Sequence, residues 1–284
     1  MPDPTSSSRL SVNGIEIAYE TIGDRDAEPV VLIMGLGTQL VGWPDEFCAQ
    51  LQTRGFFVVR FDNRDIGLST HLDWLPVPNV LAVAVGRRRP AYPLDDLATD
   101  TAGLIDALGL GRVHLVGASM GSFVAQLVAI RRPDLVRSLT LMMTSTGYRW
   151  SGRPTASVLS ATLRRKAAIS REEAIAASVR IFRMIGSPGY PFDEGMIREL
   201  AGRSYDRGYD PAGQRRQLGA VAAQTDRTRR LAQLTVPTVV MHGLADPLVN
   251  VSGGLAVARG VPRARFVGFS GMGHDLPQIG RAHV

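Results

Sequence analysis

The chain has 284 residues, a formal net charge of +6 and a hydrophobic share of 45%, which predict one large α/β domain with room for an inserted subdomain. A single cysteine, Cys48, excludes an internal disulfide, and no apolar run is long enough to predict a membrane span. Residues 1–8 are polar and do not resemble a secretory signal peptide, so we expect a cytoplasmic protein without a membrane partner.

The net positive charge alone would suggest an anionic partner such as nucleic acid. However, the basic residues are nearly all arginines and are spread along the chain. The densest run, Arg87-Arg88-Arg89, precedes Pro90 in a stretch where we expect a solvated loop. We therefore expect no nucleic-acid partner, and a steep salt dependence of DNA binding would contradict this expectation.

The first half of the chain alternates predicted strands and helices. Strands are predicted as an antiparallel pair within 11–22 around the turn Asn13-Gly14, and at 30–34, 56–61, 113–118 and 138–143. Helices are predicted at about 43–53, 94–108 and 120–132, whereas residues 71–93 are Pro-rich and irregular. This alternation predicts a mostly parallel, doubly wound sheet.

The alternation stops between about residues 148 and 234. Helical segments are predicted there at about 155–167, 170–186, 193–207 and 211–225. We interpret residues 148–234 as a helical cap, or lid, inserted into a core formed by residues 1–147 and 235–284. Strands resume at 236–241 and 264–269, on either side of a helix at about 252–260, which gives a sheet of about eight strands.

The pattern G-x-S-x-G stands at Gly117-Ala118-Ser119-Met120-Gly121, between a predicted strand and a predicted helix. A sharp turn at this place strains the backbone of the central serine and needs glycine on both flanks. It also lifts the hydroxyl above the sheet edge, at a helix N-terminus that favours a developing negative charge. We therefore predict that Ser119 is a nucleophile; the alternative is an ordinary turn in which Ser119 only caps the helix.

A serine hydroxyl needs a base, and the base needs an acid that fixes its tautomer. His274 follows the strand predicted at 264–269, and Asp246 follows the strand predicted at 236–241. Both side chains are therefore expected at the edge of the sheet where Ser119 lies. The chain order serine, aspartate, histidine is the order expected for this kind of turn. We predict His274 as the base and Asp246 as the orienting acid.

Other titratable residues are weaker candidates. His114 and His242 stand within or at the end of predicted strands, where a structural histidine is expected. His71 precedes the nucleophile in the chain, and His283 belongs to the last six residues, which are doubtful as native sequence. Asp275 is adjacent to His274 and is expected to be solvated.

A tetrahedral intermediate needs two preorganised hydrogen-bond donors for its oxyanion. The amides of Met120 and Leu36 are predicted as these donors. Gly35 and Gly37 flank Leu36 and would let the backbone approach the substrate, so we predict both as substrate-binding residues. A plain turn is the alternative for this loop. The polar segment Asp62-Asn63-Arg64-Asp65 is interpreted as a brace between loops, through Arg–carboxylate hydrogen bonds.

Several short motifs stand at or near predicted strand ends. They are Met34-Gly35-Leu36-Gly37, Gly42-Trp43-Pro44-Asp45-Glu46-Phe47, Phe61-Asp62-Asn63-Arg64-Asp65-Ile66-Gly67-Leu68-Ser69, Gly117-Ala118-Ser119-Met120-Gly121, Asp246-Pro247 and Gly271-Met272-Gly273-His274. With these motifs the sequence resembles the α/β-hydrolase superfamily, over residues 30–143 and 236–278. The second and third motifs especially resemble esterases related to aclacinomycin methylesterase, which cleave a methyl ester from an anthracycline or other small esters.

The resemblance implies a serine carboxylesterase that uses an acyl-enzyme intermediate, a small-molecule ester substrate, and no metal or cofactor. It also implies that Trp43 takes part in substrate binding and that the protein is a monomer or homodimer. Met34 replaces a histidine that many members carry at the oxyanion loop. Dehalogenases and epoxide hydrolases of the superfamily carry aspartate at position 119, so Ser119 argues against both activities.

Three other functions stay open. The first is a narrow methylesterase for a polyketide-like substrate, and the second is a lactonase, a C–C bond hydrolase or a perhydrolase. The third is an inactive hydrolase-fold protein that binds a ligand, against which an intact Ser119, Asp246 and His274 argue.

The end of the sequence raises a separate expectation. Residues 279–284 correspond to what a common sequencing-library adapter encodes in one frame. We expect that the native reading frame is lost after Gln278, as in a truncated metagenomic clone, and that a final helix is missing.

Overall fold

The computed structural model describes residues 7–164 and 167–277, so the expectations for residues 279–284 and for His283 lie outside the described residues. Its centre is one eight-stranded sheet with the order β1-β2-β4-β3-β5-β6-β7-β8. The strands are β1 (Ser8–Val12), β2 (Ile15–Ile22), β3 (Glu28–Ile33), β4 (Phe56–Phe61), β5 (Val113–Ala118), β6 (Val136–Met142), β7 (Thr238–Gly243) and β8 (Arg265–Phe269).

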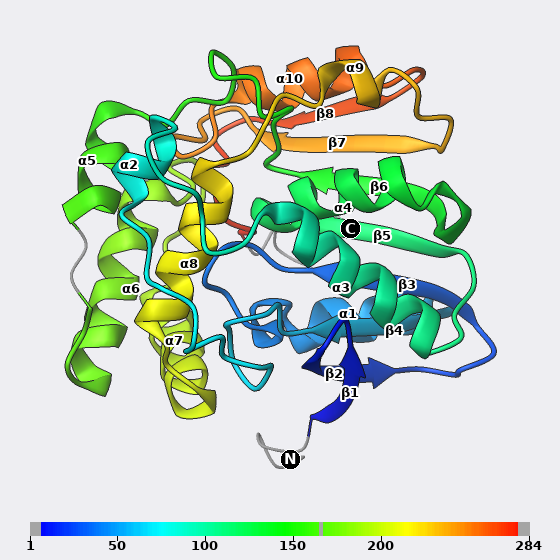
Figure 1. The fold of residues 1–284 in the computed structure, drawn as a ribbon, viewed down its shortest axis with the longest axis horizontal. Coiled ribbons are helices and arrows are strands. Elements are labelled where there is room, and N and C mark those ends of the chain that lie inside the picture. The colour runs from blue at the N-terminus through cyan, green and yellow to red at the C-terminus, as the bar shows by residue number, and fades with distance from the viewer. Residues whose placement is uncertain (1–6, 165–166, 278–284) are drawn as a thin grey trace.

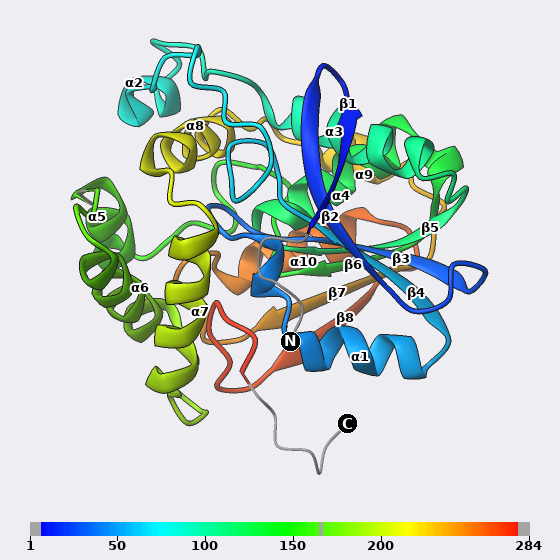
Figure 2. The same ribbon diagram turned by 90° about the horizontal axis from the view of Figure 1, so that it is seen from below.

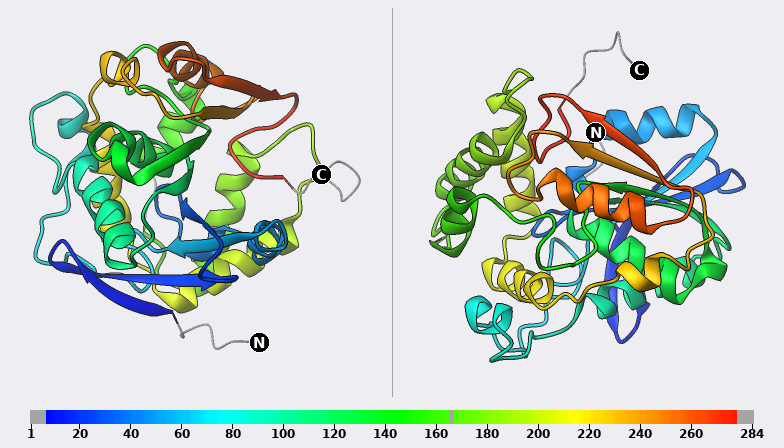
Figure 3. Two further views of the ribbon diagram at one scale, coloured as in Figure 1. Left: turned by 90° about the vertical axis from the view of Figure 1, so that its right-hand side faces the viewer. Right: turned by 90° about the horizontal axis from the view of Figure 1, so that it is seen from above.

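Strand β2 pairs antiparallel with β1 and β4, and every other neighbouring pair is parallel. Figure 3 shows β1 and β8 at the opposite edges of the sheet. The central strands β3 and β5 are buried over most of their length, which explains their nearly continuous apolar sequences. The predicted mostly parallel, doubly wound sheet of about eight strands is confirmed.

Helices cover both faces of the sheet, and α1 (Asp45–Thr53) lies on the face opposite α3 (Leu94–Ala107), as Figure 2 shows. The main hydrophobic cluster joins the strands to α3, α4 (Met120–Arg131) and α10 (Val251–Gly260). A smaller cluster lies on the α1 side and includes Cys48 and Met34. Short 3-10 helices occur at Leu40–Gly42 and Pro133–Leu135.

Four further helices gather at one end of the sheet, as Figure 1 shows. They are α5 (Ala156–Arg164), α6 (Arg171–Ile185), α7 (Glu194–Arg207) and α8 (Pro211–Ala222), and we call them the helical block. The division of the chain into a core and a cap stays a prediction. A fifth helix in this part of the chain, α9 (Thr228–Leu231), was not predicted, and its Leu231 belongs to the main core cluster.

Two sequence expectations need correction. The Pro-rich stretch 71–93 contains a short helix, α2 (Val80–Ala84), which the side chain of Asn79 caps by accepting a hydrogen bond from the Ala82 amide at 3.1 Å. Helix α8 ends at Ala222, three residues earlier than expected. Among the helices of the described residues, none combines the length and the apolar character needed to cross a membrane.

Candidate active site

Ser119 lies at the sharp turn between β5 and α4, with φ 54° and ψ −120°, a conformation that L-residues rarely adopt. Its amide donates to the Met142 carbonyl at 2.9 Å, which ties the turn to the end of β6. A Cβ atom on Gly117 would lie 2.4 Å from the Gly121 carbonyl oxygen, and one on Gly121 would lie 2.1 Å from the Ile33 carbonyl oxygen. Both flanking positions therefore require glycine.

The structure brings Ser119, His274 and Asp246 together from three strand ends. The Nε2 atom of His274 lies 2.9 Å from the Ser119 Oγ, and its Nδ1 lies 2.7 Å from Asp246 Oδ2. Because an ionised carboxylate only accepts hydrogen bonds, Nδ1 carries the proton and Nε2 is left to accept one from the serine. Asp246 and His274 are buried, whereas Ser119 is partly exposed.

Backbone amides fix the carboxylate of Asp246. Its Oδ1 accepts from the amides of Leu248 at 2.9 Å and Val249 at 2.8 Å, and its Oδ2 is left for His274. These two hydrogen bonds hold the Asp246 carboxylate in one orientation. The loop after β7 thus presents one carboxylate oxygen to His274 in a fixed direction.

Sequence reasoning missed one neighbour of this group, His242, which it assigned only a structural role. The ring is fully buried, and its Nε2 donates to the Val249 carbonyl at 2.7 Å while lying 3.5 Å from Asp246 Oδ2. Burial lowers the pKa of His242, so the ring is held neutral beside the carboxylate. The sequence offered one sign of this proximity: His242 stands four residues before Asp246, at the end of β7.

The remaining candidates lie elsewhere. His71 bonds to Asp210 and His114 bonds to Ser138, so neither reaches Ser119. Asp275 contacts Ser187 instead of His274, and it is partly buried, so the expectation of a solvated side chain is wrong. Burial raises the pKa of the Cys48 thiol to about 11, which keeps it protonated.

The loop after β3 passes close to the serine. A Cβ on Gly35 would lie 3.2 Å from the Ser119 Cβ, and Gly37 has φ +68° and donates its amide to Gln217 Oε1 at 2.9 Å. Within residues 7–164 and 167–277, the amides of Leu36 and Met120 have no hydrogen-bond partner. They remain available as the two predicted donors to an oxyanion.

Trp43 is placed differently from the other predicted site residues. Its side chain is completely buried in the smaller core cluster and stacks on Phe47, with ring centroids 5.5 Å apart. A Cβ on the preceding Gly42 would lie 2.5 Å from a Thr38 side-chain atom, so the chain is tightly packed at this turn. The structure therefore gives Trp43 a place in the core, and its position offers no support for a role in substrate binding.

The predicted brace at 62–65 is confirmed, and most of its partners lie outside the neighbouring loops. Asp62 pairs with Arg207 of α7 at 2.8 Å, and Asp65 forms two hydrogen bonds with Arg216 of α8, at 2.8 and 2.9 Å. Arg64 forms a two-fold contact with Asp100 of α3, at 2.6 and 2.7 Å. This segment therefore links the helical block to the edge of the sheet that carries the site.

The site offers acid–base and nucleophilic groups and no cluster of metal ligands. In the part of the chain that the structure describes, no group of three or more His, Cys, Asp or Glu side chains could hold a metal ion. The groups that lie together at Ser119 are a hydroxyl, an imidazole and a carboxylate.

Comparison with known proteins places this geometry in context. A family model described as alpha/beta hydrolase fold matches residues 28–277. The chain is 30% identical to the rhodomycin D methylesterase DauP of Streptomyces sp. (strain C5), over 94% of this chain and 92% of the relative. It is 26% identical to 3-oxoadipate enol-lactonase 2 of Acinetobacter baylyi, over 86% of this chain and 81% of the relative.

Among solved structures, a hydrolase from Pseudomonas aeruginosa PA01 superposes with a TM-score of 0.68. The two chains share 26% sequence identity, and the match covers 93% of this chain and 90% of the other. The likeness therefore extends over the sheet and the helical block together.

Proposed function

Because the chain belongs to the alpha/beta hydrolase family, we propose that it is a carboxylic ester hydrolase with Ser119, His274 and Asp246 as its catalytic triad. One observation carries this proposal: His274 lies within hydrogen-bond distance of both Ser119 and Asp246, at 2.9 and 2.7 Å. A nucleophile, a base and an orienting acid in this order are the groups that acyl transfer needs.

In the first step, His274 Nε2 takes the proton of the Ser119 hydroxyl while the oxygen attacks the ester carbonyl carbon. The carbonyl oxygen becomes an oxyanion, which the amides of Leu36 and Met120 stabilise. Asp246 stabilises the imidazolium that forms. The tetrahedral intermediate then breaks its bond to the alcohol oxygen, which leaves with the proton from His274.

In the second step, water attacks the acyl-enzyme. His274 takes a proton from the water, the hydroxide adds to the acyl carbon, and a second tetrahedral intermediate forms at the same donors. Collapse of this intermediate returns the proton to Ser119 and releases the carboxylic acid. Neither step needs a metal or a cofactor, because the leaving alkoxide is protonated by the same histidine.

The substrate is a small or medium carboxylic ester, and the helical block serves as the cap above it. The side chain of Gln217, on α8, reaches the amide of Gly37 in the oxyanion loop, so the block borders the place where the substrate carbonyl binds. Its helices thereby decide which acyl and alcohol groups fit. The likeness to DauP favours a methyl ester of a polyketide-like molecule within this class.

A lactone is the second candidate substrate, favoured by the likeness to an enol-lactonase. The chemistry at Ser119 is the same, because a lactone is an ester whose alcohol stays attached to the acyl group. The two candidates therefore differ in the shape of the pocket and not in the triad.

The test is hydrolysis of p-nitrophenyl esters from acetate to decanoate, followed by methyl-ester and lactone panels. The wild type and Ser119→Ala are compared in parallel. We expect the substitution to lower kcat by at least about 10⁴-fold, because the hydroxyl is the attacking group. Ser122→Ala is the matched control, since Ser122 lies on the same helix and bonds to Thr144 and to the Ser119 carbonyl.

Comparable turnover by Ser119→Ala and the wild type would refute the triad. A folded wild type that is inert toward every ester and lactone would instead favour a ligand-binding protein with a hydrolase fold. If the wild type is active, its preference for the methyl-ester panel or for the lactone panel separates a methylesterase from a lactonase.

A further inference from the structure

The turn between α6 and α7 holds the loop that carries His274. The amide of His274 donates to the Ile185 carbonyl at 2.7 Å, at the last residue of α6. Two residues further, Ser187 Oγ accepts a hydrogen bond from the Gly273 amide at 2.9 Å and donates its own proton to Asp275 Oδ1. The end of α6 and the turn that follows it therefore contact His274 and both of its chain neighbours.

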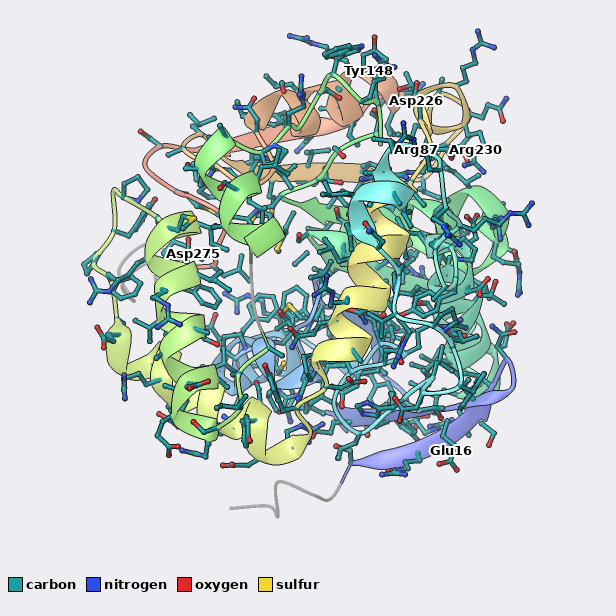
Figure 4. All side chains as sticks on the ribbon, turned by 60° about the vertical axis from the view of Figure 1, so that its left-hand side comes forward. Glu16, Arg87, Tyr148, Asp226, Arg230 and Asp275 are labelled. Atoms are coloured by element: carbon teal, nitrogen blue, oxygen red, sulfur yellow. The ribbon has the colours of Figure 1, made fainter. Side chains whose placement is uncertain are left out.

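The backbone of the α6–α7 turn packs directly against the backbone of the loop that carries His274. A Cβ on Gly273 would lie 2.2 Å from the Gly186 carbonyl oxygen, and one on Gly189 would lie 2.7 Å from the Gly271 Cα. The Gly189 amide also donates to the Gly271 carbonyl at 2.9 Å. Figure 4 places Asp275 beside α6, in agreement with its contact with Ser187.

We propose that Ser187 is a positioning residue for His274: its hydroxyl fixes Gly273 and Asp275 and thereby sets the direction of the imidazole toward Ser119. This proposal rests on the proposed function, because it assigns His274 the role of base. Ser187 itself touches none of the reacting groups. Its contribution is to the geometry of proton transfer, through the two residues that flank the base.

The chemistry of the hydroxyl suits this task. The Ser187 hydroxyl has one proton, which it donates in a hydrogen bond to the Asp275 carboxylate. Its lone pairs are then free to accept a hydrogen bond from the Gly273 amide. A hydrogen bond to a carboxylate is stronger than one between neutral groups, so the pair holds its orientation. Removing the hydroxyl leaves both the Gly273 amide and Asp275 Oδ1 without this partner.

Geometry explains why such a contact affects the rate. The His274 Nε2 must lie within hydrogen-bond distance of Ser119 Oγ when the proton moves, and displacements of about 1 Å can cost about 100-fold in rate. The His274 ring is already held on one side by Asp246. The residues at 185–189 hold the main chain of the His274 loop through hydrogen bonds to Gly271, Gly273 and His274.

The experiment compares Ser187→Ala with the wild type, with Ser187→Thr as the conservative variant. Ser178→Ala is the matched control, because Ser178 lies on α6, the helix before the turn that carries Ser187, and its hydroxyl donates to the Ala174 carbonyl of its own helix. Each protein is assayed for kcat and KM with p-nitrophenyl acetate, and for the rate of Ser119 phosphonylation by a fluorophosphonate. Unfolding midpoints are recorded for all of them.

We expect Ser187→Ala to lower kcat about 10-fold or more, with KM changed less than about two-fold, because positioning acts on the transition state. Phosphonylation should slow by a similar factor, since it depends on the same base. Ser187→Thr keeps a hydroxyl and should restore most of the rate, and Ser178→Ala should behave as the wild type.

Equal kcat for Ser187→Ala and Ser178→Ala would overturn the proposal. So would a loss that threonine fails to rescue and that follows the unfolding midpoint. A wild type that hydrolyses no ester but is phosphonylated at Ser119 would refute the proposed substrate class alone, and the phosphonylation rates would then decide on Ser187. A wild type that is not phosphonylated at Ser119 would overturn both.

Discussion

Two regions that meet at the carboxyl ends of the strands are held together in different ways. At the turn that carries Ser119, backbone packs directly against backbone. The Ser119 amide bonds to the Met142 carbonyl, and the Cα of Gly121 lies so close to β3 that a Cβ would overlap the Ile33 carbonyl oxygen. No side chain fits between Gly121 and β3, so the position of the turn depends mainly on contacts of the main chain.

On the side of α7 and α8, the helical block is attached by side chains that carry charge. Arg207 reaches Asp62, and Arg216 reaches Asp65, and all four side chains are nearly or completely buried. Gln217 bridges the Gly37 amide and the Arg64 carbonyl, at 2.9 and 2.8 Å. These contacts are made through long side chains and are directional, and the two Arg–Asp pairs among them depend on ionisation.

The difference has a functional consequence. A nucleophile must stay within a few tenths of an ångström of its productive position, and close-packed backbone provides that rigidity. We propose the helical block as a cap, which would have to accommodate different ligands, and side-chain contacts can rearrange at smaller cost than packed backbone. The α6–α7 turn is the exception within the block, because there backbone again packs on backbone beside His274.

The largest effect is expected from an added methyl group at the turn, in the variant Gly121→Ala. Its Cβ would lie 2.1 Å from the Ile33 carbonyl oxygen and 2.8 Å from that of Met34, so a strand must shift. We expect the free energy of unfolding to fall by more than about 3 kcal/mol, measured by urea denaturation. Ester hydrolysis should fall with it, because the same shift moves Ser119.

Gly260→Ala is the control for Gly121→Ala. Gly260 is the last residue of α10, and a Cβ there meets nothing within 4 Å. This variant should be as stable as the wild type or slightly more so, because alanine favours helix by up to about 1 kcal/mol over glycine. Equal stability of both variants would contradict the view that the turn is closed to side chains.

The same difference explains what the sequence could and could not predict. That Ser119, Asp246 and His274 lie together could be predicted, because each follows a strand whose apolar run is visible locally, and because glycines mark a turn that excludes side chains. The pairing of Asp62 with Arg207 and of Asp65 with Arg216 joins residues 145 and 151 positions apart, and nothing in the local pattern selects one arginine among many.

Trp43 is a different case. The resemblance implied a role in substrate binding for it, whereas the structure places its ring in the smaller core cluster. The 3-10 turn at Leu40–Gly42 directs the chain so that the ring packs under the loop, against Phe47. Which side of a loop an aromatic ring faces depends on backbone direction, and single-residue patterns do not encode that direction.

A smaller effect is expected from the variant Asp65→Asn, which removes one charge from the buried contact with Arg216. Asparagine can still bond to Tyr92 and to the Leu72 amide, and Arg216 keeps Asp73 and Asp210 nearby at 3.3 Å. We therefore expect a loss of about 2 kcal/mol, less than for a charge left without any partner. Amide hydrogen exchange should accelerate in α8 and stay unchanged in β5.

Asp206→Asn is the matched control for Asp65→Asn. Asp206 also receives two hydrogen bonds from one arginine, Arg171 of α6, but both side chains are exposed to solvent. Water screens such a pair, so we expect no measurable change in stability or in hydrogen exchange. Identical exchange patterns for the two variants would refute the assignment of the buried pair as the attachment of α8.

The smallest effect concerns pH and the contact between His71 and α8. His71 Nδ1 lies 2.8 Å from Asp210 Oδ2, and its Nε2 lies 2.9 Å from the Gly67 carbonyl. Both neighbours accept hydrogen bonds, so the ring satisfies both only when both nitrogens are protonated. Burial opposes that charge, but the two acceptors outweigh it, and the pKa of His71 is raised above its ordinary value of 6.5.

The sign of the pH effect follows from this shift. A histidine with a raised folded-state pKa contributes stability that is complete below about pH 6.5 and is lost as pH rises through the higher folded value. The pKa of Asp210 is lowered despite its burial, by the Gly213 amide and by His71, so its contribution disappears only as pH falls below its ordinary value of 3.8. The contact is therefore strongest between these two limits.

The variant His71→Gln tests this contact, because glutamine offers a donor to one acceptor and carries no charge. Below pH 6.5 the wild type should be the more stable protein by up to about 1 kcal/mol, and this difference should shrink toward pH 9 as the imidazolium loses its proton. Urea denaturation of both proteins at a series of pH values measures it. A stability difference that is independent of pH would mean that His71 acts on α8 through shape alone, and that the charges attaching the helical block are those of the arginines.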